Sequence, residues 1–136
     1  MQLHRLRRDE CKAAISAEAL SAILARFFSS ACSSDDVDRT DDQHTVAAHR
    51  IHAACEQLVS ITDCAASFPG LRVFGCSALL VFDAHAASHA AVRVCLVDFA
   101  HAFISGDSFG GADSNLCAGL SALADFLRDV ALERKM

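Results

Sequence analysis

Asp98 is the residue whose type and position are best suited to chemistry. It follows the apolar, β-branched run 92–97 (VRVCLV) and precedes a segment rich in Gly and Asp. Such a run predicts a buried strand. A carboxylate near the end of a buried strand needs a cation, backbone N–H groups or a metal ion as its partner. Asp98 is therefore either a functional residue with one of these partners or only a structural cap of the next turn, a common role for strand-end aspartates.

Two other groups of residues have metal-ligand types. His49, His52 and Cys55 are three residues apart, and these are zinc-ligand types. However, two steps of three residues rotate about 600° around a helix, leaving His49 and Cys55 roughly 120° apart. Solvent-facing or hydrogen-bonded histidines are the better interpretation. The acidic segment 29–43 lacks the Gly and the terminal Glu of an EF-hand calcium loop.

Composition limits the class of protein. The chain has 136 residues, which fits a single domain over 1–136, and its net charge of −5 argues against a general nucleic-acid binder. No apolar run approaches the roughly 20 residues of a membrane span, and no apolar core follows the basic start, so we expect neither a membrane protein nor a secretory signal. Seven cysteines without a C-x-x-C pair favour reduced thiols. We expect a cytoplasmic or nuclear location.

The hydrophobic pattern predicts an α+β fold with two N-terminal helices, an antiparallel strand pair and a C-terminal helix. The expected boundaries are a helix over Ala17–Phe28, an acidic loop or insertion over 29–43, a helix over Thr45–Thr62, paired strands over Leu71–Asp83 and Ala91–Phe99, and a helix from near Asp113. A hairpin is the natural connection of the two strands, because their join is short. This arrangement places Asp98 at the end of a sheet.

Three residues have expected structural roles around these elements. Asp113 is a candidate N-cap of the C-terminal helix. Gly119 lies inside that helix at a cost of about 1 kcal/mol, which we attribute to a close approach of another backbone. Cys95 is expected to pack in the core.

The segment around Asp98 and two others resemble a known family. The sequence V-D-F-A-H-A-F, which contains Asp98, resembles the I-D-F-A-H-T segment of the inositol polyphosphate kinase family. Upstream, Gly75–Asp83, which includes Ser77, looks like the family's Ser-Ser-Leu-Leu strand. Downstream, Asp113–Leu123 is similar to its D-x-G-Y-x-x-G-L-x-x-L pattern. The three stretches agree in order and spacing, and the resemblance spans about Ala14–Leu132, the C-terminal half of a family member.

This resemblance implies an activity and a set of functional residues. It implies ATP-dependent, Mg2+-assisted phosphoryl transfer to an inositol polyphosphate, as part of inositol phosphate biosynthesis, on a C-terminal kinase lobe. ATP and an inositol polyphosphate would be the ligands, with Mg2+ held by Asp98. His101 matches a family position near the substrate, where it would act in catalysis by holding a phosphate. Ser77, Asp113 and Gly119 would support the site.

The chain also departs from the family pattern. The P-x-x-x-D-x-K-x-G signature is absent, because the only proline is Pro69, and the only lysines are Lys12 and Lys135. Near the site, Ala102, Asn115 and Leu116 replace the usual Thr, Gly and Tyr. We therefore expect this chain alone not to turn over ATP, and a separate N-terminal lobe is a candidate partner. The alternatives are a catalytically inactive, kinase-like binding domain and an unrelated small α+β interaction domain.

Overall fold

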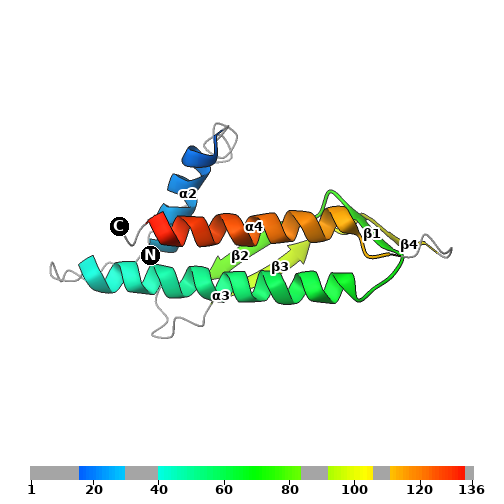
Figure 1. Ribbon diagram of the computed structural model, residues 1–136, viewed down its shortest axis with the longest axis horizontal. Coiled ribbons are helices and arrows are strands. Elements are labelled where there is room, and N and C mark those ends of the chain that lie inside the picture. Colours follow the sequence, from blue (N-terminus) through cyan, green and yellow to red (C-terminus); the bar gives the residue numbers. More distant parts are fainter. Residues whose placement is uncertain (1–15, 30–39, 84–91, 106–110, 134–136) are drawn as a thin grey trace.

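The structure is a computed structural model that describes residues 16–29, 40–83, 92–105 and 111–133. Two long helices lie side by side, with a pair of strands behind them, a shorter helix at one end and a second pair of strands at the other (Figure 1). The elements are, in chain order, α2 (Ala17–Ser29), α3 (Thr40–Ala66), β1 (Leu71–Phe74), β2 (Ser77–Phe82), β3 (Val92–Val97), β4 (His101–Ile104) and α4 (Ser114–Glu133). The predicted α+β fold is confirmed.

The helices begin close to the predicted positions, except for α3. The Ser16 hydroxyl accepts a hydrogen bond from the Ala19 N–H at 3.2 Å, which caps α2 as helix N-caps commonly do. Helix α3 extends past its predicted range at both ends. Residues 40–43 are therefore helical, and Ser29 is the last residue of α2. The loop expected over 29–43 is wrong at these two ends, and residues 30–39 lie outside the described residues. The prediction relied on apolar periodicity, but a nucleated helix propagates beyond its amphipathic part.

Both strand pairs are antiparallel, as predicted. Strand β2 pairs with β3, and β1 pairs with β4, in two separate two-stranded ladders. The predicted strand over 71–83 is thus divided into β1 and β2. The second strand is followed by a further strand, β4, in a region that the sequence pattern did not indicate.

The hydrophobic core lies between the helix pair and one face of β2 and β3. Its largest fully buried side chains come from α2, α3, β3 and α4, namely Phe28, Ile51, Leu58, Val92, Leu127 and Val130. Strand β3 alternates between buried and exposed residues, so only one of its faces contacts the core. Cys95 lies on the other face and is exposed. Its predicted core position is therefore wrong, because the run was interpreted as a strand buried on both faces.

Polar contacts join α2 and α3 at one end of the core. The buried Arg50 donates from Nη1 to the carbonyl oxygen of Phe28 at 3.1 Å. Its guanidinium also lies over the Phe82 ring, 4.3 Å from the centroid. The attraction between a cation and an aromatic face is stronger when the pair is shielded from water. Arg50 therefore fixes α2 against α3 and β2.

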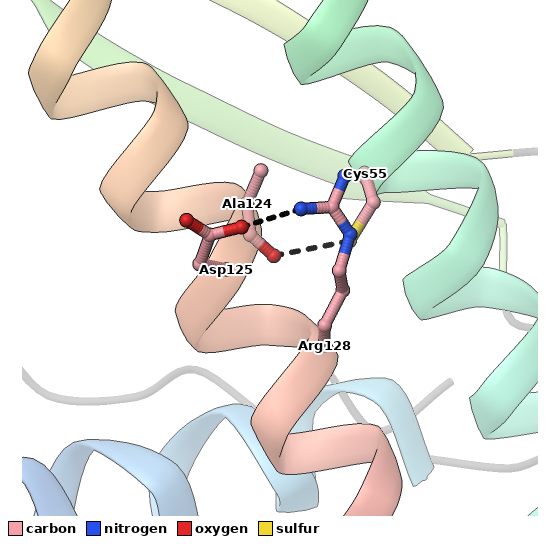
Figure 2. A network of polar contacts seen from close by, with 4 residues as sticks. All are labelled: Cys55, Ala124, Asp125 and Arg128. Carbon is pink, nitrogen blue, oxygen red and sulfur yellow. Dashed lines mark hydrogen bonds and ion pairs between the residues drawn. The ribbon is translucent and has the colours of Figure 1, made fainter.

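A hydrogen bond joins α3 to α4, beside an ion pair within α4 (Figure 2). The Cys55 thiol donates to the carbonyl oxygen of Ala124 at 3.5 Å, and the Arg128 guanidinium forms an ion pair with Asp125 beside it. Burial raises the pKa of the Cys55 thiol. Among the residues that the structure describes, no helix has the length and apolar character needed to cross a bilayer.

Candidate functional site

The predicted site lies where the two ladders meet. The last pair of one ladder is Phe74 with His101, and the first pair of the other is Ser77 with Val97. Two residues, Gly75 and Cys76, therefore face the three residues 98–100. One extra residue on one side of an antiparallel pair is a β-bulge, which bends the strand and redirects a side chain.

Asp98 is the residue at which the bulged strand changes direction. Its φ of 68° places it in the left-handed region, and it is the one non-glycine residue with positive φ in the described part of the chain. Gly75, on the opposing strand, has a φ of 71°. Asp and Asn adopt this conformation more readily than other residues with a side chain. The structure therefore places a carboxylate at a backbone position that favours Gly, Asn or Asp.

The surroundings of Asp98 differ from the prediction. Asp98 is exposed, so the expectation of a carboxylate on a buried strand that needs a partner is wrong at this position. The turn after it is closed by a backbone hydrogen bond from the Ala102 N–H to the carbonyl oxygen of Phe99 at 3.1 Å. Within the described residues, the Asp98 side chain forms no hydrogen bond or ion pair, so it does not cap this turn. The carboxylate is thus free to bind a ligand.

His101 begins β4 and lies across the ladder from Phe74. It is exposed and belongs to a strand, whereas the predicted strand ended at Phe99. Residues directly opposite in an antiparallel pair share a face, and so do alternate residues of one strand. His101, Phe74 and Phe103 therefore share a face, on which the two phenylalanine rings stack with centroids 6.0 Å apart. The bulge brings Ser77, Asp98 and His101 into the region where the β1–β4 and β2–β3 ladders meet.

Asp113 connects α4 to β1, and the predicted N-cap is confirmed. One carboxylate oxygen accepts the Leu116 N–H at 3.1 Å, and the other accepts the Val73 N–H at 2.8 Å. Asp113 is only 5% exposed. The hydrogen bond from Val73 is the main reason that the pKa of Asp113 lies below its usual value, and the bond from Leu116 acts in the same direction. This ionised side chain fixes the start of α4 to the strand that precedes the bulge.

Gly70 and Arg72 reinforce the same connection, and the sequence analysis did not identify either residue. The Arg72 guanidinium donates from Nη1 to the carbonyl oxygen of Gly111 at 3.0 Å, and the Gly70 N–H donates to the same oxygen at 3.2 Å. Gly70 has a φ of 82°, and a Cβ there would lie 2.8 Å from the carbonyl oxygen of Ser105. Only glycine fits this position. The Pro-Gly pair at 69–70 was the sequence signal for it.

Gly119 does not have its predicted role. It is exposed, and an added Cβ would meet no described atom within 4 Å. The explanation of a close backbone approach is therefore wrong. Gly119 lies on the solvent side of α4, where helix packing does not require a missing side chain.

The donor set at the bulge sets a limit on metal binding. Among the described residues, no group of three or more His, Cys, Asp or Glu side chains could enclose a metal ion. Mg2+ often binds through one or two carboxylates, several waters and substrate phosphates, without a complete protein cage. The single exposed Asp98 carboxylate fits Mg2+ in that mode, but it does not fit a structural zinc site.

The family was tested by comparing the chain with protein-family models. The model described as inositol polyphosphate kinase matches residues 2–128. The chain belongs to the inositol polyphosphate kinase family. The match covers most of the chain and includes Ser77, Asp98, His101, Asp113 and Gly119. Comparisons with curated proteins and with solved structures gave no significant match.

Proposed function

We propose that this inositol polyphosphate kinase family member provides the metal-binding region for transfer of the ATP γ-phosphoryl group to an inositol polyphosphate. The observation that supports this proposal is the exposed Asp98 carboxylate, held in a left-handed conformation at a bulge in a chain that belongs to the family. A strained backbone at an exposed acidic residue is typical of functional sites.

Asp98 is the residue that would hold Mg2+. Its carboxylate supplies an oxygen ligand, and it has no competing partner in the described part of the chain. The metal would supply charge neutralisation on the phosphate oxygens. The role of the chain itself is to fix the direction of this carboxylate, because the bulge and the opposing Gly75 determine the backbone at Asp98.

His101 would hold a phosphate of the inositol substrate. It is exposed at the start of β4, three residues after Asp98, and an imidazole N–H donates well to a phosphate oxygen. Ser77 lies on the other side of the bulge, and Asp113 supports the ribbon through its bond to the Val73 N–H. Asp98 and His101 are therefore the proposed catalytic residues.

The described residues do not offer all that phosphoryl transfer needs. Both lysines of the chain, Lys12 and Lys135, lie outside the described residues, so the described part has no ammonium group to contact the ATP phosphates. We expect a separate N-terminal lobe to supply that contact, and we expect the chain to work in the cytoplasm or nucleus. On its own, the chain should bind MgATP weakly and transfer no phosphoryl group.

The test uses the chain joined to a kinase lobe that carries the P-x-x-x-D-x-K-x-G signature. Asp98→Asn removes a charged metal ligand with little change of shape, and it should lower kcat at least about a hundredfold, or some 2.7 kcal/mol. Asp63→Asn, at an exposed carboxylate of α3, is the matched control and should leave kcat unchanged. Near-normal turnover of a folded Asp98→Asn enzyme would refute the metal assignment.

His101→Ala should act on substrate binding in the same reconstituted enzyme. The loss of a phosphate contact that exists before the reaction should raise KM for the inositol phosphate and change ATP binding less. A folded His101→Ala enzyme with an unchanged KM for the inositol phosphate would contradict the role proposed for His101.

A catalytically inactive binding domain is the second candidate function. The observation that favours it is the lack of any lysine in the described residues, together with the replacements Ala102 and Leu116. This candidate predicts that the reconstituted chain binds an inositol polyphosphate in calorimetry but transfers no phosphate from ATP. Measured turnover that depends on Asp98 would exclude it.

A further inference from the structure

The two edges of the β2–β3 ladder are not equivalent. The edge of β3 is covered by the side chain of Gln57 from α3. Its amide nitrogen Nε2 donates to the carbonyl oxygen of Val92 at 2.8 Å, and its oxygen Oε1 accepts the Val94 N–H at 3.0 Å. The side-chain amide thus makes the two hydrogen bonds that a neighbouring strand would make.

These two bonds show which residues of β2 direct their backbone N–H and C=O groups toward β3 and which direct them away from it. Because the Val94 N–H is directed at Gln57, it cannot donate to Leu80, its partner on β2. That pair is therefore a non-hydrogen-bonded pair, and such pairs alternate along an antiparallel ladder. It follows that Ala78, Leu80 and Phe82 direct their N–H and C=O groups away from β3. Within the described residues, no backbone hydrogen bond reaches these groups.

The side chains show the same asymmetry. On the core face, Val92 and Val94 of β3 are 1% and 7% exposed, whereas Leu96 of β3 and all three core-face residues of β2, Ala78, Leu80 and Phe82, are half-buried. Among the described residues, the core is therefore more closely covered beside β3 than beside β2.

The spacing of the two helices and that of the two strands indicate where the helix pair extends beyond the strand pair. Packed helices are about 8–10 Å apart and paired strands about 4.8 Å, so two strands underlie only about half of a helix pair. Strand β3 lies against α3 through Gln57, so by these spacings the uncovered half is on the side of β2. Figure 1 shows the strand pair behind the two long helices. Leu123 and Phe126 of α4 lie about 100° and about 160° round the helix from Ala124, which contacts α3, and both are only partly buried.

The outward face of the ladder adds a charge preference. Arg93 is exposed there, opposite Val81, and within the described residues it has no ion-pair partner. A strand added beside β2 would place its outward side chains next to Leu79 and Val81. An acidic side chain in that row could reach the Arg93 guanidinium.

We propose that the free edge of β2 binds an extended segment of another polypeptide as an antiparallel third strand. Its alternate residues are apolar and face α4, and its outward row carries an acidic residue. A second copy of this chain does not fit, because joining two β2 strands would bring two α4 helices, about 8–10 Å wide each, over strands about 4.8 Å apart. This binding mode is β-augmentation, and it is independent of the proposed phosphoryl transfer.

The probe is a fluorescent nine-residue peptide in which Val and Ile alternate with Thr and a central Glu. In an antiparallel addition, the apolar residues make the hydrogen bonds to β2, because they share a face with Ala78, Leu80 and Phe82. N-methylation of the apolar residues should weaken binding to the full chain at least tenfold, whereas N-methylation of the Thr residues should change it less than twofold. No binding of the probe, or an equal loss for both methylated peptides, would overturn the proposal.

Amide hydrogen exchange tests the edge directly. In the free chain, the amides of Ala78 and Leu80 should exchange fast and those of Leu79 and Val81 slowly, and the probe should slow the first pair. Slow exchange of Ala78 and Leu80 without the probe would show that another segment already occupies the edge, and the proposal would fail.

A matched pair of variants completes the test. Ala78→Pro removes an outward N–H at an edge position where proline is tolerated, and it should weaken probe binding at least tenfold. Ala78→Ser keeps the N–H and should bind the probe like the unsubstituted chain. Full probe binding by a folded Ala78→Pro variant would refute edge pairing, and the methylated peptides decide the question if this variant does not fold.

Discussion

The connection between α4 and β1 gives the sharpest test of what fixes the strands to the C-terminal helix. Asp113 accepts two backbone hydrogen bonds, from Val73 at 2.8 Å and from Leu116 at 3.1 Å, and it is 5% exposed. Asp113→Ala removes both acceptors at once. The exchange should therefore destabilise the fold more than the loss of an ordinary surface carboxylate.

The magnitude follows from the two bonds separately. Loss of a helix N-cap costs about 1 kcal/mol. The Val73 N–H, on a residue that is only 8% exposed, would lose its acceptor, which costs about 1–3 kcal/mol. Together these losses should lower the free energy of unfolding by about 2–4 kcal/mol, a large share of the roughly 5–15 kcal/mol of a typical domain. Asp113→Asn keeps one good acceptor and should lose about half as much.

The pH dependence has a defined sign. The pKa of Asp113 is lower in the folded chain than its ordinary value of 3.8, so at acid pH the unfolded state binds more protons at this site. Its contribution to stability is full above the unfolded pKa and is lost as the pH falls through the folded pKa. The difference between the unsubstituted chain and Asp113→Ala should therefore be constant from about pH 5 to 7 and shrink below about pH 4.

Urea denaturation followed by circular dichroism at several pH values measures these quantities. Asp125→Ala is the matched control, because Asp125 is an exposed carboxylate on the same helix, and its ion pair with Arg128 should contribute less than about 1 kcal/mol. A loss for Asp113→Ala below about 0.5 kcal/mol, or one that does not change with pH, would show that the two hydrogen bonds do not hold α4 to β1.

Three further predictions concern single positions. Gly119→Ala should raise the free energy of unfolding by about 1 kcal/mol, because the site is open and Ala favours a helix; a destabilised variant in the same urea assay would show that the glycine is needed. Asp98→Ala should cost about 1–2 kcal/mol through its left-handed backbone, whereas Asp98→Gly should not, and equal losses would refute the assigned conformation. Cys95, which is exposed, should react with a thiol reagent within minutes at pH 8, whereas the buried Cys55, whose pKa is raised, should react only on unfolding; fast labelling of Cys55 would contradict its burial.

Local patterns were enough to predict the elements that depend on them. The apolar periodicity located three helices and two strands, and Asp113 was identified as a cap because capping involves residues three apart in sequence. The family could also be recognised, since three short motifs between residues 75 and 123 agree in order and lie inside the matched range. The positions of Asp98 and His101 as candidate site residues came from the same motifs.

The errors of the sequence analysis have a common cause. Whether Cys95 is buried, whether Gly119 is approached by another backbone and whether Asp98 has a partner all depend on what lies opposite each residue. A run such as VRVCLV reads equally well as a strand buried on one face or on two, because both use β-branched residues. The pattern within the run cannot say which faces the helices cover.

The sequence by itself determined the family, the helices, the strand pair and the carboxylate at the strand end. Only the tertiary structure decided that Gly75 and Cys76 face residues 98–100, so that a bulge turns Asp98 toward solvent. It also decided that Gln57 closes the β3 edge of the β2–β3 ladder, while no described residue makes a backbone hydrogen bond to the β2 edge. The physical reason is that register and edge pairing depend on hydrogen bonds between residues distant in sequence, such as Gln57 with Val94, and local preferences carry no record of those partners.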